Sequence, residues 1–181
     1  IKVIAHRGNS SQAPENTLAS FQQAIRLNVD FIECDLQLSK DKVPVVMHDS
    51  TIHRILADCV VCDVDALNWE ELKKTDSGSW FDEKYSDQRV LSLEEFLKIP
   101  KGSVGSMIEI KEETFSEYEV AKIVGDIIKK FPPKDSHHGP LILGSLNPNI
   151  LMCLESYLPL QKLIAIVKDE EDLKKFRPIK A

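Results

Sequence analysis

The chain has 181 residues, a formal net charge of −6 and a sequence pI of about 5.4. This length suits one domain with a hydrophobic core, and 43% hydrophobic with 29% charged residues excludes a disordered or collagen-like chain. The acidic balance argues against a protein that wraps nucleic acid, because such proteins usually carry a basic face. No apolar run approaches the roughly 18 residues that a membrane span needs, so we expect no stable membrane insertion.

The N-terminal part of the chain alternates strand and helix patterns. Val3–Ala5 is a short apolar run that predicts a buried strand ending at His6. Leu18–Leu27 carries apolar residues at helical spacing and predicts a helix. Phe31–Leu38 and Val43–Met47 predict two further strands.

The segment Ser50–Asp87 departs from this alternation. It is polar and contains one short predicted helix at Asn68–Leu72. We predict that it forms a small insertion after the third strand, within a single domain of residues 1–181.

Regular alternation resumes after this insertion. Helices are predicted over four segments: Ser92–Leu97, Glu117–Phe131, Asn149–Tyr157 and Asp169–Phe176. Strands are predicted over three segments: Ser106–Lys111, Leu141–Leu143 and Leu160–Val167. Alternating strands and helices imply a parallel sheet covered by helices, and polar residues gather at the strand ends, as at the active-site face of a (β/α)8 barrel. About six strands are predicted where a closed barrel needs eight, so either the last units lie outside this chain or the sheet is open.

The cysteines are spread along the chain, at Cys34, Cys59, Cys62 and Cys153, without the spacing of a dense disulfide framework. A reducing compartment is therefore predicted, with the cytoplasm as the location. Because the chain starts at Ile1 rather than Met, a cropped leader stays open. We interpret Cys59 and Cys62 as ordinary thiols rather than zinc ligands, since no second cysteine pair accompanies them.

The stretch Glu33-Cys34-Asp35 carries the first chemical signal. Residues two apart on a strand point to the same side, so Glu33 and Asp35 face together while Cys34 faces the packing helices. The flanking residues are apolar, and buried carboxylates need a positive partner, so a divalent cation is predicted between them. Glu109 and Lys111 repeat this pattern of two charged residues on one face of a strand. Glu109 would be a third metal ligand, and Lys111 would offer a point charge for phosphate. The alternative is that the two residues form an ordinary surface ion pair.

Two histidines, His6 and His48, each follow a short apolar strand. Histidine titrates near neutral pH, so one ring can act as base while the other acts as acid. Arg7 suits a phosphoryl oxygen through its planar donor fork, and Asp49 either orients His48 or caps the loop. The remaining histidines lie in polar segments and are interpreted as solvated: His53, His137 and His138.

Together these motifs resemble the glycerophosphodiester phosphodiesterase family. The resemblance rests on five stretches: His6-Arg7-Gly8, Ala13-Pro14-Glu15-Asn16-Thr17-Leu18, Glu33-Cys34-Asp35, Val45-Val46-Met47-His48-Asp49 and Glu109-Ile110-Lys111. Thr51, Arg54 and Leu93-Glu94-Glu95 continue it over nearly the whole chain. The family's last barrel strands have no counterpart after Val167.

The resemblance implies an α/β fold of the TIM-type (β/α)8 barrel class, lacking its last units in this chain. The implied substrate is a small glycerophosphodiester, and the products are glycerol 3-phosphate and an alcohol, which belongs to lipid and glycerol metabolism. No nucleic acid partner is expected. The head group, the metal and any homo-oligomer are left open.

The resemblance also implies roles for individual residues. The implied metal ligands are Glu33, Asp35 and Glu109, holding one divalent cation, Mg²⁺ or Ca²⁺. The implied catalytic pair is His6 and His48, the phosphate-binding residues are Arg7 and Lys111, and the supporting residues are Glu15 and Asp49. As a hypothesis, one histidine removes a proton from an attacking hydroxyl, such as the substrate's own 2-hydroxyl, and the other protonates the leaving alcohol. Which histidine is the base is left open.

Two other functions are compatible with the sequence. A phospholipase D-like barrel enzyme acting on lysophospholipids or sphingolipids would share the metal site and expose apolar loops. In the insertion, only Trp69, Trp80 and Phe81 are candidates for such a surface. A catalytically silent phosphate-binding domain would show a broken motif, and none is broken here.

Overall fold

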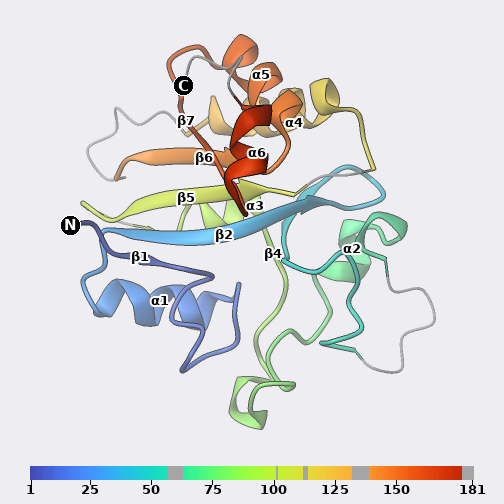
Figure 1. Ribbon diagram of the computed structural model, residues 1–181. Coiled ribbons are helices and arrows are strands. Elements are labelled where there is room, and N and C mark those ends of the chain that lie inside the picture. The colour runs from blue at the N-terminus through green and yellow to red at the C-terminus, as the bar shows by residue number, and fades with distance from the viewer. Residues whose placement is uncertain (57–62, 101, 112–113, 132–138, 177–181) are drawn as a thin grey trace.

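A repeated strand–helix unit builds the frame of the molecule (Figure 1). The computed structural model describes residues 1–181 except 57–62, 101, 112–113, 132–138 and 177–181. Over the described residues, five strands run parallel: β1 (Ile4–Ala5), β2 (Phe31–Leu38), β5 (Gly105–Ile110), β6 (Leu141–Ser145) and β7 (Lys162–Ala165). One helix lies between each parallel strand and the next, apart from the short helix of the insertion, and one more follows the last strand. These helices are α1 (Leu18–Arg26), α3 (Leu93–Phe96), α4 (Glu117–Ile128), α5 (Pro148–Tyr157) and α6 (Glu170–Lys175).

The parallel strands are neighbours in the order in which they occur in the chain, from β1 through β2, β5 and β6 to β7. Sequential order of this kind is the arrangement of a (β/α) barrel, in which each helix returns the chain to the next strand position. The predicted parallel sheet is therefore confirmed for these strands, and the predicted helices agree with the observed ones to within three residues at each end.

The third predicted strand runs in the opposite direction to the one expected. β3 (Pro44–Val46) pairs antiparallel with the end of β2, and β4 (Leu91–Ser92), which the sequence did not indicate, pairs antiparallel with β3. Only residues 39–43 separate β2 from β3, which is too short for a crossover between parallel strands. Lys42 turns the chain with a φ of 63°, so the two strands form a hairpin.

The outer edges of the sheet are less buried than the sequence predicted. Val3 and Ile4 are 55% and 45% exposed, although a buried strand was expected there. Within the described ranges β1 pairs only with β2, and β7 pairs only with β6, so neither has a partner on its other edge. These edges leave the described sheet open.

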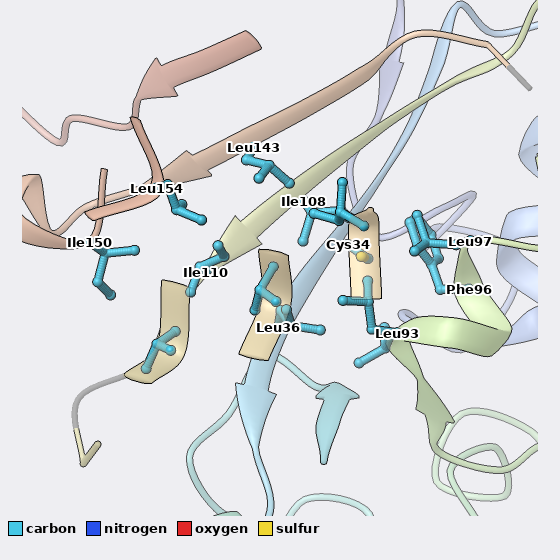
Figure 2. Packing of buried hydrophobic residues seen from close by; sticks show 14 of the residues in the cluster. Cys34, Leu36, Leu93, Phe96, Leu97, Ile108, Ile110, Leu143, Ile150 and Leu154 are labelled. Atoms are coloured by element: carbon cyan, nitrogen blue, oxygen red, sulfur yellow. The ribbon is translucent and has the colours of Figure 1, made fainter. Parts of the chain in front are cut away.

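Alternation along the strands separates an apolar face from a charged one. Cys34 and Leu36 of β2 and Ile108 and Ile110 of β5 are fully buried and contact residues of the helices (Figure 2). The predicted orientation of Cys34 is thus confirmed. Each such side chain stabilises the fold by about 1.5–3 kcal/mol through burial. The residues that alternate with them, Glu33 and Asp35 of β2 and Glu109 of β5, point to the opposite face.

The insertion shares a small second core with the segments on either side of it. Ile52, Val64 and Leu72 of the insertion are buried in one cluster with Val45 and Met47, in and after β3, and with Val90, just before β4. The predicted helix at 68–72 is confirmed as α2 (Trp69–Leu72), and two 3-10 turns flank it, η1 (Val64–Ala66) and η2 (Glu83–Tyr85). Trp69 packs against this core, so it is not a free apolar side chain. None of the helices in the described ranges is long and apolar enough to cross a bilayer.

The loop between β1 and α1 is tied to the start of that helix. Thr17 caps α1 by accepting from the Ser20 backbone N–H, and the Thr17 backbone N–H donates to the Ser20 hydroxyl oxygen. The Ser20 hydroxyl also donates to the Arg7 carbonyl, 3.1 Å away. Gly8, at φ 81°, lies so close that a Cβ atom there would be 2.7 Å from the Ser20 carbonyl carbon. These contacts fix the path of the loop that presents Arg7.

We expect Gly8→Ala to lower the free energy of unfolding by about 2–4 kcal/mol, because the substitution adds both backbone strain and a clash with Ser20. Gly102→Ala is the matched control: Gly102 has a φ of 68°, and a Cβ there would have no neighbour within 4 Å. That variant should lose only about 1 kcal/mol. Urea denaturation of both variants measures the difference, and equal losses would contradict the proposed contact.

Candidate active site

Three carboxylates converge on the charged face of the sheet. Glu33 and Asp35 lie two residues apart on β2, and the strand register places Asp35 beside Glu109 of β5. One oxygen from each lies within 4.8 Å of the others. Their residues are only 3%, 0% and 8% exposed, respectively. Like charges this close and this far from water require cations or protons.

Two basic side chains enter the same cluster from loops that follow parallel strands. The Arg7 backbone N–H donates to Glu33 Oε2 over 2.8 Å. Arg7 Nε lies 3.1 Å from Asp35 Oδ2, with the geometry of an ion pair rather than of a hydrogen bond. Lys111 Nζ lies 2.8 Å from Glu109 Oε1 and 3.3 Å from Asp35 Oδ1. The predicted phosphate-binding residues thus contact the predicted metal ligands directly.

Asn16 is a member of this cluster that sequence reasoning missed. The buried Asn16 amide donates to Asp35 Oδ2 over 2.9 Å. Its backbone has a φ of 57°, a conformation that asparagine adopts more readily than most residues. In the sequence Asn16 directly precedes Thr17, and both are residue types that commonly cap helices, so nothing there points to a strand carboxylate.

The cluster perturbs the titration of its members. Burial, followed by the charge of Asp35, raises the pKa of Glu33 from 4.5 to about 8. Burial opposes the charged form of Lys111, but its hydrogen bond to Glu109 and the charge of Asp35 outweigh burial and raise the pKa of Lys111. Glu33 therefore takes up a proton near neutral pH when no cation neutralises the cluster.

The donor set fits a hard divalent cation. Carboxylate oxygens are the preferred ligands of Mg²⁺ and Ca²⁺. Asp35 Oδ1 is buried and accepts no hydrogen bond from the described residues, so its lone pairs are directed at the cluster with only the ion pair to Lys111. A cation bound by Glu33, Asp35 and Glu109 would satisfy that oxygen and favour the ionised form of Glu33.

His48 lies on the loop directly after β3, with its neighbour as partner. His48 Nδ1 is 2.7 Å from Asp49 Oδ1. Gln37 Nε2 lies on the same side of the sheet and donates to the carbonyl oxygens of both His48 and Asp49, at 2.9 and 2.6 Å. Burial favours a raised pKa for Asp49, but hydrogen bonds from Arg54 and His48 outweigh it and lower that pKa. Asp49 is thus an ionised partner for the imidazole.

Glu15 joins the histidine loop to the carboxylate cluster. Its Oε1 lies 3.1 Å from Arg7 Nη1 and 2.7 Å from Arg54 Nη2. Arg54 Nε in turn donates to Asp49 Oδ2 over 2.7 Å. An unbroken row of alternating charge results, which runs through Glu109, Lys111, Asp35, Arg7, Glu15, Arg54 and Asp49 and ends at the imidazole of His48. Arg54 was noted only as part of the motif pattern, and its contacts could not be read from the sequence.

His6 reaches the same edge of the sheet through its backbone. Ala5, the last residue of β1, pairs with Ile32 of β2. Because the two strands are parallel, the backbone of the next residue, His6, lies beside that of Glu33. The residue is exposed, and its ring forms no hydrogen bond with the described part of the chain. Its role stays a prediction. His53 is exposed as expected, whereas four residues interpreted above lie outside the described residues: Cys59, Cys62, His137 and His138.

Two cavities adjoin the carboxylate cluster, and Lys111 lines both of them. A cavity of about 460 Å³ lies between the sheet and the insertion, where His48, Asp49 and Asp65 line it together with Lys111. A second cavity of about 560 Å³ extends from Lys111 to Asn147 at the start of α5. Both volumes suit a small molecule.

The chain is similar in sequence to proteins of one known family. The sequence profile of the Glycerophosphoryl diester phosphodiesterase family matches residues 6–180. A glycerophosphodiester phosphodiesterase of Caldanaerobacter subterraneus subsp. tengcongensis is 44% identical over 98 residues, which are 54% of this chain and 39% of that protein. One from Bacillus subtilis is 31% identical over 175 residues, 88% of this chain and 57% of that protein.

A solved structure is also similar along almost the whole chain. The phosphodiesterase of Oleispira antarctica, in complex with the product sn-glycerol-3-phosphate, has a TM-score of 0.84 and 28% identity, covering 97% of this chain and 70% of that one. This likeness confirms the predicted α/β TIM-type barrel class, while the described strands themselves form an open sheet. The chain spans about half the length of the curated relatives it matches.

We expect the metal-free fold to lose stability as the pH rises from about 4.5 to about 8. In this window folded Glu33 holds a proton that unfolded Glu33 has released, so rising pH favours unfolding by up to about 1.4 kcal/mol per pH unit. Glu33→Gln should remove this dependence, whereas Glu155→Gln, at an exposed position of α5, should keep it. Urea denaturation in EDTA at several pH values tests this; parallel wild-type and Glu33→Gln curves would contradict it.

Proposed function

This chain belongs to the glycerophosphoryl diester phosphodiesterase family, and we propose that it hydrolyses small glycerophosphodiesters to glycerol 3-phosphate and an alcohol with the help of one divalent cation. The observation that carries the proposal is the buried group of Glu33, Asp35 and Glu109, which two basic side chains contact at the carboxyl end of a parallel sheet. A related structure holds sn-glycerol-3-phosphate as its product, which supports this choice of substrate.

The cation would be held by the three carboxylates. When bound, Mg²⁺ or Ca²⁺ supplies Lewis-acid stabilisation of negative charge on a phosphoryl oxygen. Lys111 and Arg7 contact the same carboxylates, so their remaining donors are close to any phosphate that approaches the cluster. Their charges would offset the negative charge that develops on the phosphoryl oxygens.

His48 would transfer a proton through its outer nitrogen. Asp49 accepts from Nδ1, so a neutral ring carries its proton there and leaves Nε2 as the free base. His48 lines the cavity of about 460 Å³ that also contains Lys111. His6, on the exposed loop after β1, would be the second proton-transfer group. One of them would take the proton of the attacking hydroxyl, and the other would protonate the leaving alcohol.

The structure bears on the lipid-substrate alternative through the aromatic residues of the insertion. Trp69 packs on the insertion core, and the ring of Trp80 contacts Phe81 edge-on and the Arg54 guanidinium face-on. Trp69 and Phe81 are half-buried, whereas Trp80 is 38% exposed. The contacts that all three rings make within the fold support a water-soluble substrate over a lipid. The cytoplasmic location stays a prediction from the cysteine pattern.

We expect this chain to release glycerol 3-phosphate from glycerophosphocholine and glycerophosphoethanolamine with Mg²⁺ or Ca²⁺, and to stop in EDTA. His48→Ala and His6→Ala should each lower kcat by about 100- to 10,000-fold, since each removes a proton-transfer group. His53→Ala, an exposed histidine of the insertion, is the control that should keep normal turnover. An enzyme-coupled assay of glycerol 3-phosphate provides the measurement.

This assay, together with assays of lipid cleavage and of phosphate binding, separates the alternatives. Near-normal turnover in both His6→Ala and His48→Ala would refute the two-histidine scheme. Cleavage of lysophospholipids or sphingolipids without cleavage of soluble diesters would favour the lipid enzyme. Binding of inorganic phosphate without cleavage of either substrate class would favour the silent domain.

Metal binding gives an independent prediction. Isothermal titration of the wild type with Mg²⁺ or Ca²⁺ should show one site, and Asp35→Asn should weaken it by at least 10-fold, because a neutral amide replaces a charged ligand of the same shape. The metal should raise the wild-type melting temperature but not that of Asp35→Asn. Equal affinity in both proteins would place the cation elsewhere.

A further inference from the structure

Arg54 contacts both halves of the site without touching the metal cluster. Its Nε donates to Asp49 Oδ2 and its Nη2 to Glu15 Oε1, each over 2.7 Å. Its guanidinium carbon lies 4.8 Å from the centroid of the Trp80 ring. Three separate segments therefore meet at one side chain of the insertion: the loop after β1, the loop after β3 and the residues before η2.

The contact with Asp49 determines which oxygen His48 can use. Arg54 takes Oδ2, and Oδ1 is left for His48 Nδ1 at 2.7 Å. A carboxylate held in this position keeps the Nδ1 proton in place and fixes the ring plane, as the orienting partners of functional histidines do. Arg54 thus acts on the imidazole of His48 through one intervening side chain, that of Asp49.

The contact with Glu15 links Arg54 to Arg7, the proposed phosphate-binding residue. Glu15 Oε1 accepts from Arg54 and from Arg7 Nη1 at 3.1 Å, so one oxygen joins the two guanidinium groups.

Trp80 keeps Arg54 in place from the other side. Its indole N–H donates to the Ser77 carbonyl over 2.8 Å, so the ring that stacks on Arg54 is itself fixed. About 37% of the Arg54 side chain remains exposed.

We propose that Arg54 is a positioning residue that holds His48 through Asp49, with Nδ1 protonated and Nε2 presented to the substrate. The catalytic part of this inference rests on the proposed function. The positioning part does not, because it concerns the protonation pattern of one imidazole. Arginine suits the task since its planar fork supplies separate donors for two carboxylates and a flat face for the indole. A lysine has one nitrogen for all three contacts.

The direct test is the tautomer of His48, observed by long-range ¹H–¹⁵N correlation NMR of the labelled full chain, with His48→Gln to assign the signal. We expect the Nδ1-protonated form in the wild type and a mixture with the Nε2-protonated form in Arg54→Gln. Arg89→Gln is the control: the exposed Arg89 side chain donates to the backbone carbonyls of Ser86 and Gln88, and among the described residues it forms no hydrogen bond with Asp49 or His48, so this variant should give the wild-type spectrum. An unchanged His48 signal in Arg54→Gln would overturn the proposal.

Kinetics add a second readout. Arg54→Gln should lower kcat by about 10- to 100-fold, as loss of an orienting partner typically does, with KM changed less than about threefold. Arg54→Lys should recover part of kcat, because it restores the charge but not the fork. Wild-type kcat in Arg54→Gln would also overturn the proposal.

These outcomes remain distinct from a failure of the proposed function. If the wild type cleaves no diester, the His48 tautomer alone decides whether Arg54 positions the ring. If Arg54→Gln does not fold, Arg54→Lys decides: a wild-type tautomer signal there overturns the proposal, and a mixed signal supports it.

Discussion

The site depends on the register between β2 and β5, which forces like charges together. The two-residue period of a strand brings Glu33 and Asp35 to one face, and the parallel pairing puts Glu109 beside Asp35. Removed from water, these carboxylates repel one another, so the fold must deliver positive charge to the same place. Arg7 and Lys111 meet that demand, and the sheet arranges all five groups before any ligand arrives.

The two parts of the site come from different kinds of structure. The carboxylates and the basic residues belong to the repeated strand–helix units, whose helices pack on the far face of the sheet through Leu36 and Ile110 (Figure 2). His48 belongs to a hairpin that is added to the edge of β2. Side-chain contacts of Gln37 and Arg54 hold its loop against the rest.

Much of this arrangement could be predicted from the sequence, because local patterns set it. The alternation of side chains along Glu33-Cys34-Asp35 predicted that the two carboxylates face away from the core. The direction of β3 could not be predicted from its own apolar run; it follows from the short turn at Lys42. The contacts of Asn16 and Arg54 join positions far apart in the chain, and neither residue type at its place in the sequence indicates a partner.

The position of the hairpin separates two kinds of change in the sequence. Strand register is shared by every residue of β2 and β5, so a shift of register moves all three carboxylates relative to one another or to the core. The hairpin and its insertion stand outside this constraint. Apart from His48, Asp49 and Arg54, their sequence can change without moving the carboxylates of the sheet. A change of length in the insertion would therefore reshape the wall of the cavity beside His48 and leave the register of Glu33, Asp35 and Glu109 intact.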